Sequence, residues 1–91
     1  MDSRNISASS DDNATSTVTQ QLDARGLHCP LPLLKAKQRL NTMQPGEHLQ
    51  VIASDPGSWD DFASYAELSS HTLVSREQQG DTFHFVLQRG A

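Results

Sequence analysis

Residues 29–43 read CPLPLLKAKQRLNTM, and this segment sets the architecture of the chain. Its apolar side chains recur at helical spacing: Leu33, Ala36, Leu40 and Met43. That spacing predicts an amphipathic helix with one apolar stripe. We expect the helix to start at Pro30 or Pro32. Proline has no backbone N–H, and in the first turn of a helix that N–H would have no acceptor within the helix. Pro45-Gly46 ends it.

Strand patterns flank this helix on both sides. Alternation of side chains between turn residues predicts four strands, over residues 17–22, 49–53, 72–77 and 82–89. A second amphipathic helix is expected after Ser58, from about residue 59 to the Ser69-Ser70 pair that ends it. Ser58 and Asp61 are three residues apart and resemble a capping box at its start.

The resulting order, β-α-β-α-β-β, predicts an α+β fold. Two amphipathic helices and a four-stranded mixed sheet make a two-layer α/β sandwich, with both helices on one face. A right-handed crossover makes the first two strands parallel. We expect one domain over residues 17–91. Residues 1–16 are rich in serine, aspartate, asparagine and threonine, which predicts a disordered polar tail.

The single cysteine, Cys29, narrows the possible chemistry. It excludes an intramolecular disulfide, a cysteine-rich zinc site and a two-cysteine redox motif. The four histidines are scattered without metal-ligand spacing, so we expect no metal and no cofactor. There is no signal-peptide pattern and no apolar run of about 20 residues, which predicts a cytoplasmic protein without a membrane segment.

Positive charge is concentrated around the cysteine. The whole chain has a formal charge of −4, but the segment between Ala24 and Gln44 holds four cations and no acid, which leaves −8 for the rest. The four cations are Arg25, Lys35, Lys37 and Arg39. They form either a solvated helix face or a docking patch for an acidic partner or anionic substrate. The overall negative charge argues against direct binding of nucleic acid.

Cys29 is expected at the start of the first helix. A residue before proline is pushed into extended backbone, which is the conformation of an N-cap residue. The helix dipole favours the thiolate there, and Arg25 and Lys35 add to this effect if they lie close. A moderately activated thiol suits thiol exchange. The alternative is a cysteine that only packs as a small apolar side chain.

A lone thiol also limits the mechanism. Without a resolving cysteine, Cys29 cannot cycle through an intramolecular disulfide. His28 is a poor candidate for a base, because neighbouring side chains in an extended segment point apart. A carrier needs neither group, since donor and acceptor enzymes supply them.

Residues 22–32, LDARGLHCPLP, resemble the Asp-x-x-Gly-x-x-Cys-Pro-x-Pro signature of the TusA-like (SirA/TusA) sulfur-carrier family. The similarity extends over about residues 20–90. It implies a sulfurtransferase of the carrier type, in which Cys29 takes persulfide sulfur from a cysteine desulfurase and passes it to a downstream acceptor protein. The supporting residues would be Gly26, Pro30 and Pro32 of the signature, together with Arg25.

Docking of partner proteins is the second implication of the resemblance. Basic positions on the first helix of the family, here including Lys37, help to dock the desulfurase, and Lys35 and Arg39 extend this basic segment. Asp55, in the Asp-Pro pair, is implicated in partner handling, although it also suits a turn or a helix cap.

The sequence departs from the family pattern at two informative positions. Leu31 stands where members of the tRNA-thiolation branch have glutamate, and Ala66 stands where some relatives have a second cysteine. The acceptor pathway therefore remains open between tRNA thiolation, molybdenum-cofactor enzymes and sulfur oxidation. The alternative function is a regulatory or chaperone-like adaptor in which Cys29 is dispensable. We expect a monomer in either case.

Overall fold

The computed structural model describes residues 18–91. The expected polar tail, residues 1–16, lies outside these residues. The elements follow one another as β1 (Val18–Ala24), α1 (Leu31–Leu40), β2 (His48–Ala53), α2 (Ser58–Leu68), β3 (Thr72–Gln79) and β4 (Thr82–Gln88). The predicted order, β-α-β-α-β-β, is thereby confirmed.

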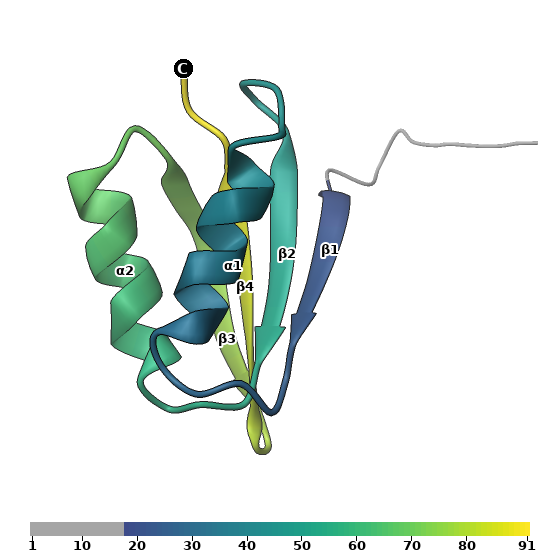
Figure 1. Ribbon diagram of the computed structural model, residues 1–91, viewed down its shortest axis with the longest axis vertical. Coiled ribbons are helices and arrows are strands. Elements are labelled where there is room, and N and C mark those ends of the chain that lie inside the picture. The colour runs from purple at the N-terminus through teal and green to yellow at the C-terminus, as the bar shows by residue number, and fades with distance from the viewer. Residues whose placement is uncertain (1–17) are drawn as a thin grey trace, which may run out of the picture.

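The four strands form one mixed sheet in the order β1-β2-β4-β3. β1 runs parallel to β2, as predicted for the first crossover, and the other two pairs are antiparallel. Both helices cover the same face of this sheet (Figure 1). The predicted two-layer α+β sandwich is therefore confirmed. No helix within residues 18–91 combines the length and the apolarity needed to cross a bilayer.

The core fills the space between the sheet and the two helices. Every second residue of β2 and β4 is buried, namely Leu49, Val51, Ala53, Phe83, Phe85 and Leu87. Phe62 of α2 stacks on Phe85, with ring centroids 4.4 Å apart. Full burial of a large apolar side chain stabilises a fold by about 1.5–3 kcal/mol, so these alternating positions fix which face of the sheet receives the helices.

Two arginines fasten α1 to the sheet. The Arg39 guanidinium donates to the carbonyl of Gln21 on β1 at 3.1 Å and to Oε1 of Gln20 at 3.4 Å. Arg89, which follows β4, donates from Nε to the carbonyl of Leu40 at 2.9 Å. This second bond satisfies one of the carbonyls that a helix leaves unpaired at its C-terminus. α1 is therefore tied to the sheet at two places, at β1 and at the end of β4.

The helix starts differ from the sequence predictions. α1 begins at Leu31, with Pro30 as its N-cap residue, so Cys29 lies one position further out than predicted. α2 begins at Ser58 behind an N-cap glycine, Gly57, and the predicted capping box is wrong. Asp55 takes over the capping, because its side chain accepts the Gly57 N–H and its carbonyl accepts the Ser58 N–H. The Ser58 hydroxyl is buried without a hydrogen-bond partner among the described residues.

Candidate functional site

Cys29 lies exposed in the loop between β1 and α1, two residues before the helix. The Cys29–Pro30 peptide bond is cis. Pro32 is fully buried in the first turn of α1, so it anchors the helix start beside the thiol. The alternative in which the cysteine only fills the core is wrong, because Cys29 is an exposed residue. The sulfur is therefore accessible to another molecule.

A tight turn at Gly26 brings the chain from β1 to the cysteine. The Leu27 N–H donates to the Ala24 carbonyl at 3.3 Å, and Gly26 has a φ of +81°, a left-handed conformation that favours glycine. The Gly26 N–H donates to the Ser54 hydroxyl at 2.8 Å. Ser54 follows β2, so this bond ties the cysteine loop to the ends of two neighbouring strands.

The Cys29 thiol contacts a carboxylate of α2. Sγ donates to Oδ2 of Asp61 at 2.7 Å. This hydrogen bond, followed by desolvation and by the negative charges of Asp61 and Asp55, raises the pKa of Cys29 above its ordinary value. The helix dipole is screened at an exposed terminus, whereas the carboxylate touches the sulfur. The predicted activated thiolate is therefore wrong for the free protein, in which the thiol form is favoured.

Arg25 does not support the thiol in the way predicted. Its guanidinium forms two hydrogen bonds with the carboxylate of Asp23, at 2.8 and 2.9 Å. The Arg25 side chain is the main reason that the pKa of Asp23 falls to about 2. Neither Arg25 nor Lys35 is among the groups that shift the pKa of Cys29. Arg25 therefore shapes the loop before the cysteine through an exposed ion pair.

Asp55 lies next to the thiol and shapes the turn into α2. Its Oδ2 accepts the main-chain N–H of Gly57 at 3.1 Å, and its Oδ1 lies 4.0 Å from Nδ1 of His28. Gly57 packs so closely that a β-carbon there would lie 2.9 Å from Asp55 Oδ2 and 3.7 Å from Sγ of Cys29. Asp55 thus acts locally as a turn and helix-cap residue, which is one of the two roles predicted for it from the sequence.

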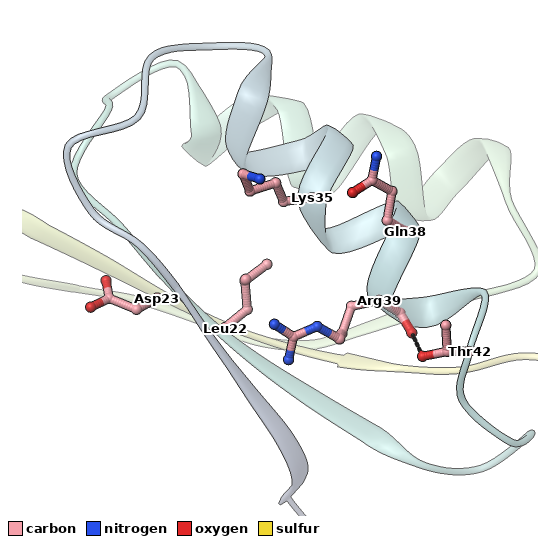
Figure 2. Close-up of a pocket in the computed structure, with 6 residues that line it drawn as sticks. All are labelled: Leu22, Asp23, Lys35, Gln38, Arg39 and Thr42. Carbon is pink, nitrogen blue, oxygen red and sulfur yellow. Dashed lines mark hydrogen bonds between the residues drawn. The ribbon is translucent and has the colours of Figure 1, made fainter.

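The remaining predicted cations do not form a single patch. Lys35 and Arg39 lie on the side of α1 that faces β1, where they line a cavity of about 390 Å³ with Leu22, Asp23, Gln38 and Thr42 (Figure 2). Lys37 lies on the other side of the helix, with Nζ 5.4 Å from the centroid of the Tyr65 ring. The docking patch predicted from charge alone is therefore divided between two faces of α1.

Two residues of the site are not predicted as such by the sequence. Its pattern gives Asp61 only a place in a capping box and gives Gly57 no role at the thiol. The Asp55-Pro56-Gly57 turn signal could have placed Gly57 near a helix start, but no spacing rule joins either residue to Cys29. Within residues 18–91, no three histidine, cysteine, aspartate or glutamate side chains are grouped to hold a metal ion.

Residues 20–89 match the family model described as sulfurtransferase TusA. The sulfur carrier protein TusA of Allochromatium vinosum is 47% identical over 70 residues, which cover 77% of this chain and 92% of that protein. The putative sulfur carrier protein YrkI of Bacillus subtilis is 35% identical over 69 residues, 76% of this chain and 92% of that protein. A putative sulfur carrier protein of Neisseria meningitidis serogroup A is 40% identical, over 77% and 95% of the two chains.

The fold is also similar to a solved structure. The crystal structure of a SirA-like protein from Desulfitobacterium hafniense superposes with a TM-score of 0.69 and covers 80% of this chain and 100% of its own. Its sequence identity is 21%, so this likeness bears on the α+β architecture alone.

Proposed function

The chain belongs to the sulfurtransferase TusA family, and we propose that it is a sulfur carrier that holds the transferred sulfur as a persulfide on Cys29. One observation carries the proposal: the only thiol of the chain is exposed in front of α1, where another protein can reach it. The names of the relatives, sulfur carrier proteins in each case, support the same function.

The proposed donor is a cysteine desulfurase that carries a persulfide on its own cysteine. Cys29 attacks the outer sulfur of that persulfide, the bond between the two donor sulfurs breaks, and the donor cysteine leaves as a thiolate. The proton of the Cys29 thiol ends on the departing group. An acceptor thiolate later attacks the outer sulfur on Cys29 in the same way and restores the free thiol.

Docking is proposed to involve the face of α1 that borders the cavity. Lys35 is exposed there, whereas Arg39 is already engaged with β1. Lys37 and Asp55 are proposed as further docking residues from the family resemblance. We place the relay in the cytoplasm, since an exposed unpaired thiol persists in a reducing compartment. The acceptor would serve tRNA thiolation, a molybdenum-cofactor enzyme or another sulfur-transfer pathway.

The decisive experiment is a persulfide transfer assay read by mass spectrometry. The protein is incubated with a cysteine desulfurase and cysteine, and the intact mass is measured before and after dithiothreitol. We expect a species heavier by one sulfur atom that dithiothreitol removes, and no such species with Cys29→Ser. Absence of the adduct from the wild-type protein across several desulfurases would refute the carrier function.

Cys29→Ser, together with charge reversal on α1, also separates the carrier from an adaptor. If Cys29→Ser retains full activity in cells while charge reversal at Lys35 and Lys37 abolishes it, the protein acts as a regulatory or chaperone-like adaptor. The division of the cations between two faces of α1 favours the carrier, because an adaptor without chemistry depends entirely on its binding face.

A further inference from the structure

Asp61 holds the Cys29 thiol from a neighbouring helix. Its main-chain N–H donates to the Gly57 carbonyl at 3.1 Å, which fixes the residue in the first turns of α2. From there Oδ2 accepts the hydrogen of Sγ at 2.7 Å. Within residues 18–91 this thiol is the only side-chain donor to Asp61. The carboxylate is therefore directed at the sulfur and does not cap α2.

The other titratable groups around the sulfur do not offset this carboxylate. Asp55 adds a second negative charge, and its side chain is only 19% exposed. His28 lies 4.0 Å from Asp55 with a ring that is 92% exposed, and Arg25 is paired with Asp23. No lysine or arginine within residues 18–91 forms an ion pair with Asp55 or Asp61. The surroundings of Sγ thus carry negative charge, in agreement with the raised pKa of Cys29.

We propose that Asp61 is a positioning residue that biases the carrier toward its unloaded form, a role that rests on the proposed function of Cys29. The carboxylate binds the hydrogen of the free thiol. A Cys29 persulfide has no hydrogen on Sγ to donate, and its negative charge lies beside that of Asp61. The unloaded carrier is stabilised and the loaded carrier is destabilised, so the sulfur is readily handed on.

The exchange balances without a redox partner. Cys29–SH and a donor R–S–S⁻ give Cys29–S–S⁻ and R–SH: one S–S bond breaks, one forms, and the proton passes from Cys29 to the donor thiolate. Asp61 is not consumed, and its effect is on the equilibrium constant. A neutral side chain at position 61 therefore shifts this equilibrium toward the loaded carrier.

The first test needs no sulfur transfer. The rate of Cys29 alkylation by iodoacetamide is measured against pH for wild type, Asp61→Asn, Asp61→Glu and Asp60→Asn. Asp60 is the matched control, since it is an exposed neighbour on α2 that loses the same charge. We expect the Asp61→Asn profile to move to lower pH, with several-fold faster alkylation at neutral pH. Asp61→Glu and Asp60→Asn should stay near wild type, and coincident Asn profiles at positions 60 and 61 would overturn the proposal.

The second test measures loading at equilibrium. Each protein is mixed with glutathione persulfide and glutathione at a fixed ratio, and the persulfidated fraction is read by mass spectrometry. We expect a several-fold larger equilibrium constant for loading of Asp61→Asn than of wild type or Asp60→Asn. Equal loading of all three would refute the role of Asp61 while leaving the carrier function intact. Absence of loading in every variant, wild type included, would refute both, even with a shifted alkylation profile.

Discussion

Gly57 lies directly against Cys29, so that a β-carbon at position 57 would sit 3.4 Å from Cβ of the cysteine. The same β-carbon would lie 2.9 Å from Oδ2 of Asp55, which is closer than such atoms approach in folded proteins. Gly57 has a φ of −62°, a conformation open to any residue. Glycine is therefore needed here to leave space for the thiol and the carboxylate, and not to allow an unusual backbone conformation.

Gly57→Ala should displace the Asp55 carboxylate and weaken its hydrogen bond to the N–H of residue 57. We expect a loss of about 1 kcal/mol in the free energy of unfolding, as for other overpacked sites, measured by urea denaturation. The control is the same substitution in an Asp55→Ala background, where the clashing atom is gone and the loss should shrink. An equal loss in both backgrounds would show that the clash is not the cause.

Gly26→Ala should strain the turn that leads to the cysteine. A side chain at a φ of +81° costs roughly 1–2 kcal/mol in the free energy of unfolding. Because Gly26 also anchors the loop to Ser54, we expect the iodoacetamide reactivity of Cys29 to change as well. Gly46→Ala is the matched control, since Gly46 has a φ of +91° in a turn after α1, remote from the thiol. It should lower stability by a similar amount and leave the reactivity of Cys29 unchanged, and a parallel change in reactivity would argue against the role of the Gly26 turn.

The layers of the fold could be predicted because their signals are local. Burial at every second residue of β4 follows directly from the alternation around Phe83, Phe85 and Leu87. The apolar stripe of α1 likewise predicted which residues face the sheet. Element ends were less accurate: the helix predicted to reach Met43 ends at Leu40, and Met43 is buried in the following turn. A buried residue fits a helix stripe whether or not the helix continues to it.

The surroundings of the thiol could not be predicted in the same way. Cys29 and Asp61 are separated by 32 positions, and they meet only because α1 and α2 start at the same end of the sheet. A sequence pattern shows only which charges are near along the chain, so it offered Arg25 and Lys35 as cations that would favour the thiolate if they lay close to the sulfur. The structure pairs Arg25 with Asp23 instead. The negative charge around the cysteine therefore results from the packing of α2 against the cysteine loop, which a local sequence pattern does not show.

Substitutions of Lys35 and Arg39 should distinguish a role in docking from a role in stability. Arg39→Ala removes hydrogen bonds from α1 to β1, so we expect a loss of about 1–2 kcal/mol in the free energy of unfolding. Lys35 is exposed, so Lys35→Glu should leave urea denaturation nearly unchanged. It should nevertheless slow persulfide transfer from a cysteine desulfurase, with a rate that depends on ionic strength. A Lys35→Glu rate equal to that of wild type would remove this face of α1 from the docking surface.

His71 should make the stability of the fold depend on pH. Its Nδ1 accepts the Gly90 N–H at 2.9 Å, and burial, followed by the charge of Arg89, lowers its pKa below the ordinary value of 6.5. As the pH falls below about 6.5, the unfolded chain therefore takes up this proton before the folded chain does. The contribution of His71 is complete above that pH and is lost between it and the lower pKa of the folded state. We expect the Tm to fall between neutral pH and pH values near 5, and His71→Gln to reduce that fall, whereas His48→Gln should not. An undiminished fall with His71→Gln would assign the pH dependence to other groups.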